Sequence, residues 1–341
     1  MSTIREVAKL AGVSITTVSR ILNNDETFIV SKETRKKVME AVKKLKYERK
    51  RRKGMNSQVK ISIIKSFDER TEMEDPYFIS LKIDLEREIR KKGMKSRTFS
   101  LDDIKNLNND KENLADGNFI YLSTSDAILI IGEIEDSQRR ILKNINKNII
   151  CVDAYSTDNI FDYIKFDTRN SVALILEYLT GLNHKKIGLL VGRNQFVKNL
   201  IDFREVHFKE IMESLGLFNS SFLEVGEFSP ESGYLMMKKL LSYTEIPTAV
   251  FCGNDSIAMG AYRAIREKNL KIPSDISVIG FNDLKLSQYM TPPLTTVRID
   301  TGIIAIEAVN SLTELLNGER NYSKKVYLPV ELIERGSCQK I

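Results

Sequence analysis

Hydrophobic positions recur at helical spacing in three groups within the first fifty residues. Thr3 and Glu6 form a capping-box pattern, in which each side chain satisfies a free amide at the start of a helix, and Gly12 ends the group that follows. Ser14 is the expected N-cap of a second helix, and Ser31 is that of a third. The residues expected to pack in one small core are Ala8, Leu10, Val13 and Val18, with Ile21 and Leu22 from the second helix and Val38, Ala41, Val42 and Leu45 from the third. A glycine-containing turn between two short helices predicts a helix-turn-helix unit.

From residue 59 onward, short hydrophobic runs alternate with amphipathic stretches, which favours parallel sheets with helices on both faces. Strands are expected at 59–64, 127–131, 149–153, 186–191, 249–252 and 277–281, and helices at 79–90, 172–179, 204–215 and 256–268. Ligands of such folds gather at the carboxyl ends of the strands. The polar residues that follow the hydrophobic runs are Asp68, Asp153, Arg193, Asn254, Asp255, Asn282 and Asp283.

The balance of charged residues also changes near residue 60, close to where the hydrophobic pattern changes. Residues 1–60 contain 16 Lys and Arg against 6 Asp and Glu, whereas residues 61–341 contain 36 against 40. Basic side chains that neutralise phosphates release counterions, so a basic end favours a nucleic-acid contact, with membrane-surface binding as the competing interpretation. We expect a helix-turn-helix domain at 1–46, a basic linker at 47–58 and a larger body at 59–341.

Several classes of protein are disfavoured by what the sequence lacks. No run of about 18 apolar residues could span a membrane, and the N-terminus has no apolar core of a secretory signal, so we expect a cytoplasmic protein. The three cysteines lie far apart without metal-ligand spacing, which predicts reduced thiols and no metal. Dinucleotide, phosphate-loop and nucleophile-elbow motifs are missing, so neither catalysis nor a cofactor is expected. His184 is interpreted as a solvated turn residue.

The run from Ile4 to Asn23 resembles the headpiece of the lactose/galactose-repressor (LacI/GalR) family of bacterial regulators, most of all its galactose- and galactoside-responsive members. The resemblance places Ile15, Thr16 and Arg20 at base-contacting positions. Arginine can donate two hydrogen bonds to guanine, worth about 1–3 kcal/mol of discrimination; a solvated surface role for Arg20 and a packing role for Ile15 are the alternatives. The expected DNA-binding residues are Thr3, Ser14, Ile15, Thr16, Thr17, Ser19, Arg20, Asn23, Arg49 and Arg51.

Residues 47–54 are strongly basic, a composition that either stays flexible or orders against phosphate. Many family members have a hinge helix here that inserts a leucine into the minor groove. This chain has no leucine between Leu45 and Leu81, so it departs from that pattern. An electrostatic clamp on the phosphates is the alternative that this sequence offers.

Further blocks between residues 202 and 297 also resemble the family. The implied fold is an N-terminal all-α headpiece followed by an α/β body of two lobes around a cleft, similar to sugar-binding periplasmic proteins, with parallel doubly wound sheets. Carried over by resemblance, the expected ligand-binding residues are Asp75, Phe78, Arg204, Phe228, Asn254 and Asn282. Such a set offers hydrogen bonds and a flat apolar face to a hydroxyl-rich ring. The alternatives are a core role for Phe228, a capping role for Asn254 and a helix start at Asp75-Pro76.

These features predict a sequence-specific DNA-binding repressor whose operator affinity is controlled by a small-molecule effector. A sugar such as a galactoside is the first expectation; a purine or a phosphoprotein is the alternative, and inducer or corepressor action is left open. A small headpiece contacts few bases, so we expect a homodimer on a palindromic site, without a membrane partner. The C-terminus has no leucine heptad for a tetramer. The rival classes are an enzyme, a transport-type sugar receptor and an architectural DNA binder.

Overall fold

The computed structural model describes residues 2–22, 28–45, 47, 58–101, 117–155, 159–193, 197 and 200–341. The N-terminal unit consists of α1 (Ile4–Ala11), α2 (Ile15–Leu22) and α3 (Lys32–Lys44). Thr3, Ser14 and Ser31 each accept a hydrogen bond from the amide three residues further along, at 3.0–3.3 Å. Gly12 ends α1 with a left-handed φ of 68°, a conformation that favours glycine. The predicted caps of all three helices are confirmed.

The three helices enclose a small core of their own. It consists of Val7, Ala8, Ala11, Val18, Ile21, Leu22, Val38, Met39 and Ala41, with Val13, Val42 and Leu45 packed against it. The prediction that Leu10 joins this core is wrong, because its side chain is 46% exposed. A helix turns about 100° per residue, and Leu10 therefore lies to one side of the stripe that Val7 and Ala11 centre on.

The first lobe of the body contains a six-stranded, fully parallel sheet. Its strands are β1 (Lys60–Lys65), β2 (Lys95–Ser100), β3 (Ala127–Ile131), β4 (Ile149–Val152), β5 (Asp162–Phe166) and β11 (Lys325–Leu328), in the order β11-β5-β4-β3-β1-β2. Its helices are α4 (Glu69–Glu74), α5 (Pro76–Lys91), α6 (Gly117–Thr124), α7 (Asp136–Ile145) and α12 (Thr301–Asn317). Every residue of β3, β4 and β5 is buried, as expected where helices cover both faces of a parallel sheet.

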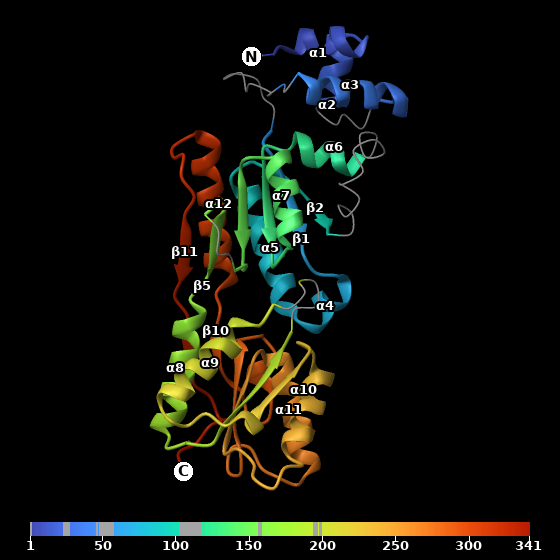
Figure 1. Ribbon diagram of the computed structural model, residues 1–341. Coiled ribbons are helices and arrows are strands. Elements are labelled where there is room, and N and C mark those ends of the chain that lie inside the picture. The colour runs from blue at the N-terminus through green and yellow to red at the C-terminus, as the bar shows by residue number, and fades with distance from the viewer. Residues whose placement is uncertain are drawn as a thin grey trace.

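The second lobe repeats this plan (Figure 1). Its strands are β6 (Ile187–Gly192), β7 (Leu223–Gly226), β8 (Ala249–Cys252), β9 (Ser277–Asn282), β10 (Thr295–Arg298) and β12 (Glu331–Ile333), in the order β12-β10-β9-β8-β6-β7. Its helices are α8 (Thr168–Gly181), α9 (Phe203–Ser214), α10 (Pro230–Leu240) and α11 (Asp255–Glu267), with short 3-10 turns η3 (Ser220–Phe222) and η4 (Ser287–Tyr289). Only the edge strand β12 runs antiparallel among these described strands.

All the strands and helices predicted for the body occur within a few residues of their expected bounds. The chain passes between the lobes three times: from β5 to α8, from β10 to α12, and from β11 to β12. These crossings bring the carboxyl ends of both sheets to face one cleft, which positions the site described below. In the described part of the chain, no helix is long and apolar enough to cross a membrane.

His184 is not the solvated turn residue that its neighbours suggest. Its side chain is 1% exposed. Its Nδ1 atom lies 2.9 Å from Thr248 Oγ1, and its Nε2 atom lies 3.1 Å from Ser277 Oγ and 3.0 Å from the Gln339 carbonyl oxygen. Burial lowers the pKa of His184. The prediction is wrong because the C-terminal segment covers this turn, and that contact spans more than 150 residues of sequence.

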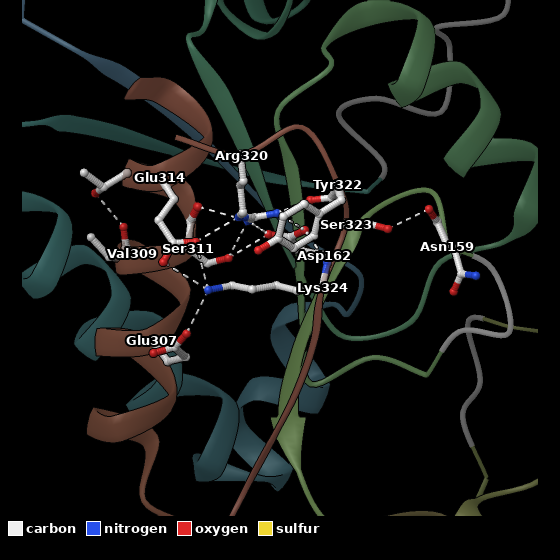
Figure 2. Close-up of polar contacts among 11 residues, drawn as sticks. Asn159, Asp162, Glu307, Val309, Ser311, Glu314, Arg320, Tyr322, Ser323 and Lys324 are labelled. Carbon is white, nitrogen blue, oxygen red and sulfur yellow. Dashed lines mark hydrogen bonds and ion pairs between the residues drawn. The ribbon is translucent and has the colours of Figure 1, made fainter. Parts of the chain in front are cut away.

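A buried polar cluster connects the end of α12 to β5 in the first lobe (Figure 2). Arg320 forms an ion pair with Asp162, and their side chains are 4% and 1% exposed. Arg320 also pairs with Glu314 at 2.8 Å, and Ser311 donates to Asp162 at 2.6 Å. Lys324 then bonds Glu314 at 3.0 Å. These contacts hold the segment that leads into β11 against the edge of the sheet.

Candidate functional site

The start of α2 presents the predicted DNA-binding residues at the surface of the N-terminal unit. Ser14, Ile15 and Thr16 are exposed, and the Ile15 side chain is 44% exposed rather than packed in the core. Because α2 has a positive N-terminal end, this surface suits the approach of phosphate groups. Thr17 and Ser19 lie half-buried beside it.

Arg20 lies one turn or more beyond this surface on the same helix. Its guanidinium carbon lies 4.7 Å from the centroid of the Phe28 ring, so the side chain is oriented by a cation–π contact rather than freely solvated. Thr3 is exposed, and its hydroxyl caps α1. The predicted contacts Asn23, Arg49 and Arg51 lie outside the described residues, as does most of the basic linker.

A cavity lies between the two lobes, at the carboxyl ends of their strands. Five of the six predicted ligand-binding residues line it: Asp75, Phe78, Arg204, Phe228 and Asn282. The other lining residues are Ser66, Phe67, Thr71, Glu74, Tyr77, Gly132, Glu133, Asp153, Tyr155, Phe166, Arg193, Leu200, Ile201, Asp202 and Glu227. Asn254 does not line the cavity but lies directly behind Asp75.

Asp75 connects the lobes through a buried hydrogen bond. It is the N-cap of α5 and accepts from the Tyr77 amide at 3.3 Å, while its other oxygen accepts from Asn254 Nδ2 at 2.9 Å. Asn254 in turn caps α11, because its Oδ1 accepts from the Ile257 amide at 2.8 Å. Asn254 therefore caps α11, and this bond to its Oδ1 fixes the side chain so that Nδ2 points toward Asp75. Burial raises the pKa of Asp75, and the bond from Asn254 opposes the shift.

Arg204 is held in the cavity wall by hydrogen bonds from all three of its guanidinium nitrogens. Its Nε and Nη2 atoms donate to the two oxygens of Asp202 at 2.8 and 2.7 Å, and its Nη1 donates to the Gly253 carbonyl at 2.6 Å. Its guanidinium carbon also lies 4.6 Å from the centroid of the Phe228 ring. That ring lies against Gly192, where a Cβ atom would come within 2.5 Å of it. Phe228 is thus half-buried and partly available to a ligand.

Three further groups in the wall were not among the predicted ligand-binding residues. Burial raises the pKa of Asp153 to about 6 and that of Glu133 to about 7. The Tyr77 hydroxyl is buried near Asp153 but has no partner within 3.5 Å and in hydrogen-bonding geometry among the residues that the structure describes. The strand-end rule did point to Asp153, which follows β4, but Tyr77 lies on a helix and carries no such signal. An unsatisfied hydroxyl and buried carboxylates suit a ligand that both donates and accepts hydrogen bonds.

Comparison with known proteins decides the family. The model for "Bacterial regulatory proteins, lacI family" matches residues 3–50, and that for "Periplasmic binding protein-like domain" matches residues 176–338. The HTH-type transcriptional regulator GanR of Bacillus subtilis (strain 168) is 30% identical over 344 residues, which cover 99% of both chains. The chain belongs to the lacI family of bacterial regulatory proteins. The HTH-type transcriptional repressor PurR of Haemophilus influenzae (strain PittEE) is 33% identical over 349 residues and matches the whole of both chains.

Solved structures of lacI-family regulators share the fold of this lacI-family chain. The transcriptional regulator CelR–cellobiose complex superposes with a TM-score of 0.69 at 21% identity, covering 99% of this chain and 100% of the other. The lac repressor dimer bound to operator and the anti-inducer ONPF gives a TM-score of 0.69 at 24% identity, covering 99% of each. The family membership and the helix-turn-helix unit together make this chain a DNA-binding transcriptional regulator.

Proposed function

We propose that this chain is a repressor that binds a palindromic operator as a homodimer. Its affinity for the operator would fall or rise when a sugar binds, with galactosides as the first candidates. The headpiece at 1–46 would contact DNA, the basic segment at 47–58 would join it to the body, and the body at 59–341 would bind the effector and the second copy. The chain would act by binding alone, without catalysing a reaction.

The DNA-binding role is supported by the charge distribution and by the surface of α2. The positive excess lies in the first sixty residues, and the exposed Ser14, Ile15 and Thr16 lie at the end of α2 that family headpieces insert into the major groove. Arg20, oriented by Phe28, is the proposed base contact with the greatest discrimination.

The charge of the cavity is the observation that carries the effector proposal. Its described lining contains six carboxylates and two guanidiniums: Glu74, Asp75, Glu133, Asp153, Asp202 and Glu227 against Arg193 and Arg204. Both arginines already form ion pairs, Arg193 with Glu205 and Arg204 with Asp202. Among the residues that the structure describes, a phosphorylated or carboxylated ligand would find no cation outside an ion pair in this lining, whereas the hydroxyls of an uncharged sugar can donate to the carboxylates. Cellobiose and ribose are the ligands named for two solved members of the fold.

An effector in this cavity would contact both lobes and so alter the angle between them. Asp75 from the first lobe meets Asn254 from the second at 2.9 Å, and Arg70 meets Glu227 at 3.3 Å across the same cleft. A ligand that binds one lobe angle more tightly than another shifts the population toward it. In a dimer this shift would change the spacing of the paired headpieces.

Operator binding measured by gel shift tests both halves of the proposal. The probe is the DNA upstream of the chain's own coding sequence, with and without a panel of neutral sugars, purines and sugar phosphates. We expect salt-sensitive, sequence-specific binding that one neutral sugar alters. Absent or salt-insensitive binding would contradict the DNA-binding role. Specific binding that responds only to a purine or a phosphorylated ligand would contradict the sugar proposal.

A further inference from the structure

A second cavity adjoins the first one at the cleft. Glu133, Tyr155 and Leu200 line both cavities, so the two cavities adjoin at these three side chains. The rings of Tyr155 and Phe203 stack across the lobes with their centroids 4.1 Å apart and their planes 19° apart. The second cavity thus draws residues from both lobes, as the first does.

Lys165 contributes an ammonium group to this second cavity. Its side chain extends from β5, is 8% exposed, and makes no hydrogen bond or ion pair with a described residue. Its Nζ atom lies 3.1 Å from the ring centroid of Tyr155 and 5.7 Å from those of Phe203 and Tyr327. Burial lowers the pKa of Lys165 to about 8, and nearby carboxylates oppose the shift, so the ammonium stays protonated at neutral pH. The ammonium can therefore donate up to three hydrogen bonds to a ligand in a space lined by aromatic rings.

The charge around the second cavity is close to balanced. Its described lining contains four carboxylates, Glu133, Glu135, Asp136 and Asp167, and four cations, Arg139, Lys165, Arg169 and Lys325, with His207 beside them. Such a lining gives an anion no net attraction. An uncharged sugar ring offers oxygen acceptors to the ammonium and an apolar C–H face to the rings.

We propose that the second cavity is a subsite for a second sugar unit, with Lys165 donating to its oxygens and the Tyr155–Phe203 pair contacting its face, so that the effector is a disaccharide or longer. This inference rests on the proposed sugar-binding function of the first cavity. The subsite would make the chain bind disaccharides more tightly than monosaccharides, because a monosaccharide in the first cavity would offer no acceptor to the Lys165 ammonium.

Calorimetric titration of the full chain tests this subsite. The probes are galactose, glucose, lactose, β-1,4-galactobiose, cellobiose and galactose 6-phosphate, and the variants are Lys165→Met and Phe203→Leu, with Lys209→Met on the exposed side of α9 as the matched control. We expect one disaccharide to bind at least roughly tenfold more tightly than its component monosaccharide, the size of one hydrogen bond to a charged group. Lys165→Met and Phe203→Leu should each remove most of that advantage and leave monosaccharide affinity within about twofold, and Lys209→Met should change neither.

Four outcomes would overturn the inference. A monosaccharide that binds as tightly as every disaccharide, or a Lys165→Met loss equal for both sizes, would leave the sugar proposal standing and refute the second subsite. Tighter binding of galactose 6-phosphate than of any disaccharide would mean that Lys165 binds an anion. Absence of binding by every sugar would refute the proposed function and this inference with it. Circular dichroism of each variant separates a binding defect from misfolding.

Discussion

The hydrogen bond between Asp75 and Asn254 allows a sharp test of how the two lobes communicate. Both oxygens of Asp75 act as acceptors, one for the Tyr77 amide and one for Asn254 Nδ2. The Asn254 amide cannot rotate without losing the cap of α11, because its Oδ1 accepts from Ile257. In Asp75→Asn the new amide can still accept from Tyr77, but its nitrogen then faces the nitrogen of Asn254. Two buried donors would point at each other.

The expected cost follows from this geometry. A buried donor left without an acceptor costs about 1–3 kcal/mol. If the effector binds the lobe arrangement that this bond stabilises, Asp75→Asn lowers effector affinity about 5- to 150-fold. The reciprocal change Asn254→Asp keeps a capping residue on α11 and supplies an acceptor. The double variant Asp75→Asn/Asn254→Asp should therefore recover most of the lost affinity.

Calorimetric titration with the sugar identified by gel shift measures this double-mutant cycle. Asp300→Asn, at the exposed N-cap of α12, is the control because Asp and Asn cap helices about equally well. The reasoning is refuted if Asp75→Asn binds the effector within twofold of the parent chain. It is refuted equally if the double variant binds no better than the weaker single variant, because the two side chains would then act independently.

Three further results are expected. Arg20→Ala should weaken binding to the operator by roughly tenfold, as loss of a base contact worth about 1–3 kcal/mol implies, while competition with random DNA changes little; equal losses on both DNAs would make Arg20 a phosphate contact. Burial raises the pKa of Asp153 to about 6, and sugar hydroxyls donate to its ionised form, so effector affinity should rise with pH between 5 and 7 by at most tenfold per unit. Asp153→Asn should bind weakly and lose the rise centred near pH 6, keeping only a rise near pH 7 from Glu133; an unchanged profile would remove Asp153 from the contact set. Asp162→Ala should lower the free energy of unfolding in urea by about 1–3 kcal/mol, because it removes the buried acceptor of Arg320 and Ser311 and leaves Arg320 with only its Glu314 ion pair; a change below about 0.5 kcal/mol would show that water replaces the lost carboxylate.

Local sequence signals were sufficient wherever the physics is local. Caps such as Ser31 act over three residues, and hydrophobic periodicity reports which side of a helix or strand is buried. The strand-end rule directed attention to Asp153 and Asn282 because parallel strands end at a common edge. The two failures have different physical origins. Leu10 lies beside the buried stripe of α1, which is a matter of helix geometry within one element, whereas the burial of His184 depends on a distant C-terminal segment.

The sequence by itself determined the helix-turn-helix unit, the alternation of strands and helices, and the basic end of the chain, since each depends on neighbours within one element. Only the tertiary structure decided which side chains meet across the cleft. Asp75 and Asn254 lie 179 positions apart, and the Lys165 ammonium faces a ring from α9. Such contacts depend on how two lobes, connected by three crossings of the chain, pack their strand ends together. No periodicity along one segment records that arrangement, because the partners belong to different sheets.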